Sequence, residues 1–320
     1  MIEKVIFLGG NVFKEDGPVL EFAKICKKLK IDTFLFTNKI RIDYPTRSYG
    51  SFRDGLKKIK INYKVIKNFG EKEIFEIKKM IIKDKTAIIS LNADWIFKKN
   101  FLSKNRVYNF HNASLPLQRG GACHSWRIMM NNFSTSLTFH LISNKIDAGD
   151  IIYSKKINVP KYCLNPSDYY KHIKKASNLS FEAFLKIINK KKIKKIRQNN
   201  SKSFYWPRLK TEKNGYIDWS WSAENILSFI NAFSDPFIGA TTFYEKNKVY
   251  LKNVKIVDKK TNFHPYQAGL IYRVKKNKIY ISTISGGIEC SYRTLKGKKL
   301  KVGNRFHTDL KSIFLSRNLS

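Results

Sequence analysis

The chain lacks the features that mark secreted, membrane-spanning or disulfide-bonded proteins. It has 4 cysteines in 320 residues, without the paired C-x-x-C spacing of a structural zinc site and without a disulfide framework. No apolar run approaches the length of a membrane span. Residues 1–10 also lack the basic start and long apolar stretch of a secretory signal. We therefore expect a cytoplasmic protein with no bound metal and no membrane partner.

Acidic residues are scarce as well. The chain has 24 Asp and Glu against 62 Lys and Arg, which gives a net charge of +38. Such a charge would attract RNA or another anionic partner. However, Lys, Ile and Asn are abundant throughout the chain, even where no task for them is visible. A composition bias of the whole proteome is the preferred explanation, and a dedicated RNA-binding surface is the alternative.

The apolar content and the length predict a folded protein with two domains. Apolar residues make up 42 % of the chain, which excludes intrinsic disorder, and a domain usually takes roughly 150 residues. In the first part strands alternate with helices, which predicts an α/β fold with a Rossmann-like, mostly parallel sheet and flanking helices. The expected strands are 4–8, 32–37, 86–91, 107–111, 136–142 and 151–159, and the expected helices are 18–29, 73–82 and, as one or two helices, 166–188.

The pattern changes near residue 205. Residues 189–197 are nearly all Lys and Ile, and the polar stretch 198–201 is typical of a link between domains. The predicted domains are therefore 1–205 and 206–320. In the second we expect a helix over 222–233 with Ser222 as its N-cap. Short strands at 241–244, 249–257, 269–274 and 278–283 then have the spacing of a smaller, OB-like β-barrel.

Two glycines, Gly9 and Gly10, follow the first expected strand and invite comparison with a dinucleotide-binding loop. The third glycine of G-x-G-x-x-G is missing, and no acidic residue ends the second strand. A tight turn is therefore the preferred interpretation.

The strand 107–111 carries the candidate chemistry. Alternation along a strand sends Asn109 and His111 to the same face. Both lie at the carboxyl end of the strand, where open α/β sheets form their ligand crevices. Asp147 follows a strand that would return the chain to the same end of the sheet. Its carboxylate would favour the protonated imidazole and hold its tautomer, although a His or an Asn alone at a strand end is more often an ordinary satisfied polar residue.

These residues form an ordered set of motifs: N-x-H at 109–111, L-P-x-x-R-G at 115–120 and I-D-x-G at 146–149. In this order and at this interval the sequence resembles the 10-formyltetrahydrofolate-dependent formyltransferase family, and the resemblance covers nearly the whole chain. Residues 218–240 independently resemble the start of the second domain of methionyl-tRNA formyltransferase and its amino-sugar relatives.

The resemblance implies roles for the three polar residues. Asn109 would donate a hydrogen bond to the formyl oxygen as negative charge develops there, and His111 would stabilise that charge and take part in proton transfer. Asp147 would keep the imidazole basic and oriented. The co-substrate 10-formyltetrahydrofolate would lie across the end of the sheet. The residues implied to surround it are Asp94, Trp95, Ile96, Phe97, Ala113, Ser114, Leu115, Pro116, Arg119, Gly121, Ser143, Asn144, Lys145 and Ile146. Residues 95–97 are equally typical of a protein core.

The motifs alone do not identify the amine that accepts the formyl group. The family's tRNA enzymes normally carry a Gly-, Arg- and Lys-rich insertion after the second strand. Here the matching residues 41–51 include Tyr-Gly-Ser at 49–51, which looks more like the amino-sugar enzymes. The family's usual S-L-L-P is also replaced by Ala-Ser-Leu-Pro at 113–116. Both departures favour a nucleotide-linked amino sugar of surface polysaccharide synthesis, and the charge keeps initiator methionyl-tRNA as a close alternative.

Two further functions stay open. A basic binding module with a degenerate enzyme fold is one, and the intact set of Asn109, His111 and Asp147 argues against it. Hydrolysis of formyltetrahydrofolate to formate is the other, and a second domain after residue 205 argues against it because a hydrolase needs no platform for an acceptor. The sequence identifies neither the sugar nor the nucleotide, and it does not distinguish a monomer from a homodimer.

Overall fold

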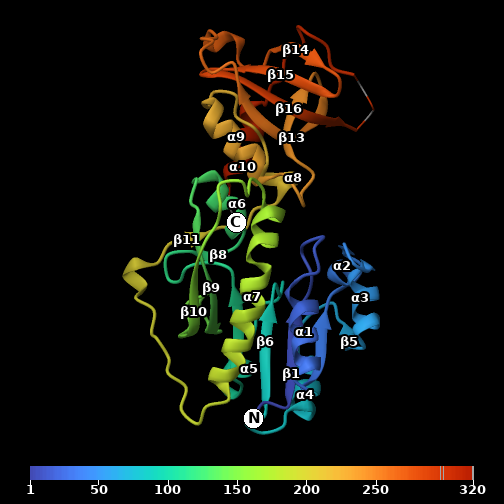
Figure 1. Cartoon of the computed structure of the whole chain (residues 1–320), viewed down its shortest axis with the longest axis vertical. Coiled ribbons are helices and arrows are strands. Elements are labelled where there is room, and N and C mark those ends of the chain that lie inside the picture. Colours follow the sequence, from blue (N-terminus) through green and yellow to red (C-terminus); the bar gives the residue numbers. More distant parts are fainter. Residues whose placement is uncertain (296, 298, 319–320) are drawn as a thin grey trace. The chain divides into compact units, whose positions relative to one another are not determined.

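The structure, a computed structural model, describes residues 1–295, 297 and 299–318. It divides into two compact units, each built from several stretches of chain (Figure 1). Unit 1 comprises Met1–Gly120, Ser134–Val159 and Tyr170–Tyr205, and unit 2 comprises Gly121–Phe133, Pro160–Tyr169 and Trp206–Ser320.

A seven-stranded sheet forms the centre of unit 1, with the strand order β10-β9-β7-β6-β1-β2-β5. Its strands are β1 (Lys4–Gly9), β2 (Asp32–Thr37), β5 (Asn62–Val65), β6 (Thr86–Leu91), β7 (Val107–His111), β9 (Ser134–Leu141) and β10 (Ile151–Asn158). The strands from β7 to β5 pair in parallel, whereas β9 and β10 are antiparallel. The predicted α/β class with a mostly parallel sheet is confirmed.

Apolar side chains cover both faces of this sheet. Alternation along β1 sends Val5 and Phe7 into one apolar cluster and Ile6 and Leu8 into the other. The helices of this unit are α1 (Pro18–Lys28), α2 (Lys39–Ile42), α3 (Phe52–Ile59), α4 (Glu71–Met80), α5 (Lys99–Lys104) and most of α7 (Pro166–Ile188). Among the described residues, no helix combines the length and the apolar character needed to cross a membrane. Burying each large apolar side chain contributes about 1.5–3 kcal/mol, so these layers hold the sheet in place.

Gly9, the last residue of β1, allows a close approach of two backbones. A Cβ atom on Gly9 would lie 2.1 Å from the carbonyl oxygen of Leu91 at the end of β6. Gly9 also has a φ of +132°, which residues with a side chain rarely adopt. This position therefore requires glycine for local structure.

The polar stretch 198–201, predicted as a link between domains, is exposed at Asn199, Asn200 and Ser201 but buried at Gln198. Before it, Ile196 and Ile151 exchange backbone hydrogen bonds of 2.9 Å. Gln198 is buried, and a short 3-10 helix, η1 (Asn200–Lys202), follows. Its polar side chains are satisfied by partners within unit 1, so this stretch is an ordered element of that unit.

Unit 2 contains a five-stranded antiparallel sheet with the order β12-β13-β16-β15-β14. Its strands are β12 (Ala240–Tyr244), β13 (Asn247–Val257), β14 (Ile271–Lys275), β15 (Lys278–Thr283) and β16 (Gly286–Thr294). The helices are α6 (Cys123–Met129), α8 (Thr211–Asn214), α9 (Ala223–Ala232), η2 (Pro265–Gln267) and α10 (Leu310–Arg317). The predicted N-cap is present, because the Ser222 hydroxyl accepts a hydrogen bond from the Asn225 N–H at 3.3 Å. Four further strands have two residues each. They are β3 (Pro45–Thr46), β4 (Gly50–Ser51) and β8 (Arg119–Gly120) in unit 1, and β11 (Tyr205–Trp206) at the boundary between the units in the sequence.

Candidate functional site

The site is built on β7 and β9, which are hydrogen-bonded neighbours in the sheet of unit 1. Asn109 lies opposite His140 in their register, so the two side chains share one face. The next pair, Phe110 and Phe139, packs on the other face with ring centroids 4.7 Å apart. Apolar packing on that side therefore directs the polar residues of both strands, including His111, to the opposite side.

The Asn109 amide makes two side-chain contacts. Its Nδ2 lies 3.1 Å from Nε2 of His140 and 3.3 Å from Oδ1 of Asp147. The other ring nitrogen of His140, Nδ1, lies 2.8 Å from the Leu141 carbonyl oxygen, which can only accept. In the neutral ring Nδ1 therefore carries the proton and Nε2 accepts from Asn109. These two acceptors fix which atom of the amide is nitrogen.

His111 is held from its far side. Its Nε2 donates to the Gln118 carbonyl oxygen at 2.7 Å, so Nδ1 is the unprotonated nitrogen of the neutral ring. Nδ1 faces Oδ2 of Asp147 at 3.8 Å, with both side chains largely buried. A proton taken up at Nδ1 would therefore complete an ion pair with Asp147.

Asp147 supplies a fixed negative charge. Burial alone would raise the pKa of its carboxyl group, but His111, His140 and a hydrogen bond from the backbone N–H of Gly120 together hold that pKa well below its usual range. The Gly120 N–H donates to Oδ2 at 2.9 Å. The carboxylate is consequently ionised at neutral pH, and the structure brings together the three side chains that the sequence singled out.

His140 is a site residue that the sequence analysis missed. It lies in a predicted strand, but only the antiparallel register of β9 against β7 shows that it faces Asn109. Its Nε2 is also 3.4 Å from Oδ1 of Asp147. Within the described part of the chain, no group of three or more His, Cys, Asp or Glu residues is placed to hold a metal ion.

The residues after β6 divide into core and surface positions. Trp95 and Phe97 pack against Phe69, with ring centroids 6.0 and 5.1 Å apart. Ile96 between them is 92 % exposed. The core interpretation therefore accounts for the two aromatic residues, whereas Ile96 presents an apolar side chain to solvent.

Asp94, another residue implied to surround the folate, is part of a polar network. Its two carboxylate oxygens accept hydrogen bonds from Nε and Nη2 of Arg41 at 3.0 and 2.9 Å. Asn38, the N-cap of α2, donates to the same carboxylate at 3.1 Å. Asp94 therefore ties the loop after β6 to the start of α2.

The turn after His111 is held to β9. The Ala113 carbonyl oxygen accepts from the Thr138 hydroxyl at 3.0 Å. The Ser114 N–H donates to Oε1 of Gln118 at 3.1 Å. The other residues implied around the folate in these loops are the half-buried Leu115, Pro116 and Ser143 and the exposed Asn144, Lys145 and Ile146.

Arg119 and Gly121 have separate surroundings. Arg119 is buried in unit 1, where its guanidinium donates to the side chains of Gln198 and Asn200. Gly121 belongs to unit 2, where its N–H donates to the Trp206 carbonyl oxygen at 2.8 Å. The guanidinium of Arg119 is thus committed to protein partners.

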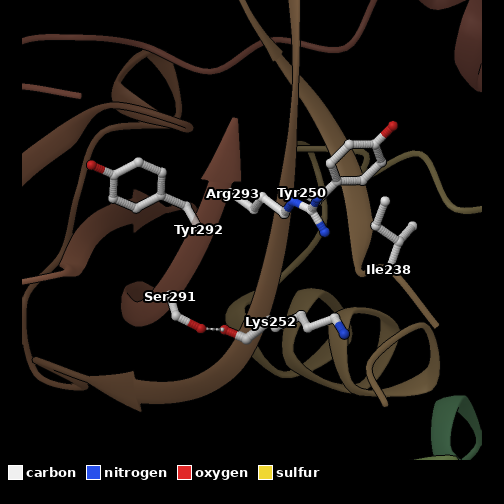
Figure 2. Close-up of a pocket in the computed structure, with 6 residues that line it drawn as sticks. All are labelled: Ile238, Tyr250, Lys252, Ser291, Tyr292 and Arg293. Atoms are coloured by element: carbon white, nitrogen blue, oxygen red, sulfur yellow. Dashed lines mark hydrogen bonds between the residues drawn. The ribbon is translucent and has the colours of Figure 1, made fainter. Parts of the chain in front are cut away.

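A separate pocket of about 170 Å³ lies on the sheet of unit 2 (Figure 2). It is lined by Ile238, Tyr250, Lys252, Ser291, Tyr292 and Arg293. Tyr250 pairs with Arg293, and Lys252 with Ser291, so these four side chains share one face of β13 and β16. Arg293 and the Tyr250 ring suit an anion that carries a flat ring, whereas the ammonium of Lys252 already donates to Oδ1 of Asp235 at 2.8 Å.

Comparisons with known proteins agree on one family. The model of the formyl transferase C-terminal domain matches residues 210–308. The bifunctional polymyxin resistance protein ArnA of Wigglesworthia glossinidia brevipalpis is 29 % identical over 225 residues, which cover 65 % of this chain and 33 % of that protein. A methionyl-tRNA formyltransferase of Thermotoga neapolitana is 26 % identical over 202 residues, covering 62 % of this chain and 61 % of that protein.

The fold agrees as well. An N-formyltransferase from Helicobacter canadensis, solved with folinic acid and dTDP-3-aminofucose, superposes with a TM-score of 0.60 at 21 % identity, covering 92 % of this chain and 100 % of that one. The chain spans about a third of the ArnA relative and about three fifths of the methionyl-tRNA formyltransferase. The chain is thus similar to formyltransferases in sequence and in fold, and its residues 210–308 match the formyl transferase C-terminal domain.

Proposed function

We propose that the chain transfers a formyl group from 10-formyltetrahydrofolate to the amino group of a nucleotide-linked amino sugar. The observation that carries this proposal is the convergence of an amide, an imidazole and an ionised carboxylate, from Asn109, His111 and Asp147. The folate and the dTDP-linked amino sugar bound to the Helicobacter canadensis enzyme support the choice of both substrates.

The reaction places two demands on the protein. The amine nitrogen forms a bond to the formyl carbon, the electron pair of the carbonyl moves onto oxygen, and the bond to the folate nitrogen then breaks. Over the reaction the amine loses one proton and the folate nitrogen gains one. The site must therefore stabilise negative charge on the formyl oxygen and move a proton.

The geometry of the site meets both demands. The contact of Asn109 with Asp147 is the longer of its two, at 3.3 Å, so this is the N–H for which the formyl oxygen can compete with the carboxylate. His140 keeps hold of the other. A donor of this kind contributes about 3 kcal/mol to stabilisation of the transition state. His111 can accept a proton at Nδ1, because Asp147 stabilises the imidazolium that forms.

Two exposed apolar side chains suit the flat ring of the folate. Ile96, in the loop after β6, is 92 % exposed, and Ile146, in the loop before Asp147, is 60 % exposed. Covering such side chains with a ring removes apolar surface from water. We place the folate against these loops. We also place the protein in the cytoplasm, where a reducing environment would keep its 4 cysteines as thiols.

Methionyl-tRNA is the second candidate acceptor, and the pocket of unit 2 favours it. Phosphates bind Lys and Arg, and unstacked bases of RNA bind aromatic rings. Arg293 and Tyr250 offer both kinds of contact on one face (Figure 2). The net charge of +38 would further attract RNA.

Formyl transfer from a labelled donor tests these functions together. Purified protein receives 10-formyltetrahydrofolate labelled in the formyl group with UDP- and dTDP-linked amino sugars, with methionyl-tRNA, or with no acceptor. We expect label on the sugar amine. Turnover on methionyl-tRNA and on no sugar would overturn the sugar assignment, and labelled formate without any acceptor would indicate a hydrolase. Equal background release by the wild type and Asn109→Ala would show that the site is not catalytic.

A further inference from the structure

We propose that Gln198, held by Arg119, is a positioning residue that sets the place of Asp147 in the site. This inference rests on the proposed function of the same site. The sequence pattern assigns residues 198–201 to a polar link, whereas the structure buries Gln198 against the loop that carries the carboxylate.

The loop that carries Asp147, residues 145–150, has a strained backbone that contacts with other segments must stabilise. Asp147 has a φ of +47°, in the left-handed region that a residue with a side chain seldom occupies. On one side the loop presses against β9, since a Cβ atom on Gly149 would lie 1.8 Å from the Leu141 carbonyl oxygen. Partners on the other side must therefore hold the strained backbone in place.

Gln198 supplies this support from the other side. Its Nε2 donates to the carbonyl oxygens of Asp147 and Gly149 at 2.8 and 2.7 Å, which uses both amide hydrogens. Its Oε1 accepts from Nε and Nη2 of Arg119 at 3.1 and 2.9 Å. Every hydrogen-bonding position of this amide is used, so its orientation is fixed.

Arg119 acts on Asp147 by two routes. Through Gln198 it fixes the backbone of Asp147, and the next residue in the chain, Gly120, donates its N–H to the Asp147 carboxylate at 2.9 Å. Nη2 of Arg119 also donates to Oδ1 of Asn200 at 2.9 Å. One short segment therefore controls both the backbone and the side chain of Asp147.

The consequence for catalysis is specific. Asp147 faces His111 across 3.8 Å, so a small movement of the loop changes how well it stabilises a proton on that ring. A displacement of about 1 Å costs up to about 100-fold in rate. Because Gln198 itself touches no substrate in this proposal, its loss should act mainly on kcat, and KM should rise only for the folate, which we place against Ile146 of the same loop.

Gln198→Glu and Gln198→Asn are the informative variants. Glutamate keeps a partner for Arg119, as an ion pair, but offers no N–H to the two carbonyl oxygens. Asparagine keeps the amide on a side chain that is shorter by one carbon, so it should retain part of the activity. Gln267→Leu, in unit 2, is the matched control, since its Oε1 accepts from the His264 N–H.

The experiment combines kinetics with hydrogen exchange. We measure kcat and KM for Gln198→Glu, Asp147→Asn and the double variant, and backbone amide exchange of residues 145–150 in the wild type and Gln198→Glu. We expect kcat to fall about 10- to 100-fold in Gln198→Glu, less in Gln198→Asn, and not at all in Gln267→Leu. The double variant should be no slower than Asp147→Asn, and exchange over 145–150 should speed up.

Unchanged exchange over 145–150 in Gln198→Glu would overturn the proposal. The proposal would also fail if the double variant lost as much kcat as the two single losses multiplied together. Gln198 would then act independently of Asp147. A wild type that transfers no formyl group to any acceptor would refute the proposed function instead, and the exchange measurement would still decide whether Gln198 holds the loop.

Discussion

The side-chain amide of Asn109 donates to Nε2 of His140 over 3.1 Å, and this contact sets the orientation of the amide in the site. The Nδ1 proton of His140 is committed to the Leu141 carbonyl oxygen. His140 therefore serves as an acceptor that points the amide nitrogen towards Asp147, where an oxyanion can compete for the second N–H. In this arrangement one histidine orients the amide, and the other, His111, faces the carboxylate.

Replacing His140 should slow catalysis without abolishing it. In His140→Leu the amide of Asn109 loses its acceptor, and a neutral hydrogen bond contributes about 1 kcal/mol, which corresponds to a fall in kcat of about 5-fold. His140→Gln should recover much of that loss, because its side-chain oxygen can accept the same N–H. Steady-state kcat of the two variants checks this, and equal rates for His140→Leu and the wild type would contradict the orienting role.

Replacing Asn109 itself should be more severe. Asn109→Ala removes the donor proposed for the developing oxyanion, so kcat should fall about 100- to 1,000-fold. Single-turnover formyl transfer measures this, and folate binding followed by tryptophan fluorescence serves as the control. Weakened folate binding that accounts for the whole loss would assign Asn109 to binding rather than to the transition state.

The stability of the protein should depend on pH through Asp147. Its folded-state pKa is depressed, so the carboxylate contributes stability that is present above the ordinary aspartate pKa of about 4 and is lost as the pH falls towards the folded pKa. Between pH 6 and pH 3 the free energy of unfolding of the wild type should therefore decline more than that of Asp147→Asn. Urea unfolding at the two pH values measures both, and parallel declines would show that Asp147 is not responsible.

Much of unit 1 could be predicted because its strands are buried and its motifs are local. β2, β6 and β7 occupy the residues that their apolar runs indicate, and alternation along β7 correctly pairs Asn109 with His111 on one face. In contrast, α3 was not predicted. It is a helix of 8 residues, four of them charged, with a glycine, Gly55, inside it. A Cβ atom at Gly55 would lie 2.8 Å from Leu20, so tertiary packing outweighs helix propensity there.

The site residues that the sequence analysis did not predict are also positioned by tertiary contacts. His140 contacts Asn109 only through the register of two strands, and Gln198 reaches Asp147 across 51 positions of the sequence. No periodicity within either segment reports such a partner. β16, which begins with Gly286 and Gly287 and contains Glu289, also lacks an apolar run, so its pairing with β13 and β15 had to come from the structure.

Reversing one charge in the pocket of unit 2 distinguishes between the two candidate acceptors, the amino sugar and methionyl-tRNA. Arg293 is an exposed residue of β16 that lies opposite Tyr250 in the sheet register. Arg293→Glu should leave kcat and KM for a nucleotide-linked amino sugar unchanged, because in our proposal the sugar is formylated at the site of unit 1. If RNA phosphates bind this pocket, the same change should weaken methionyl-tRNA binding about tenfold and lower the slope of affinity against salt by about one.

A matched charge reversal outside the pocket makes this comparison specific. Lys311 is an exposed residue of α10, so Lys311→Glu changes the net charge by the same amount. We expect binding of methionyl-tRNA, measured at two salt concentrations, to respond to Arg293→Glu and much less to Lys311→Glu. Equal weakening by the two changes would mean that RNA is attracted by the overall charge of +38 and that the pocket does not recognise it, because a general field acts alike on both positions whereas a phosphate contact acts on one.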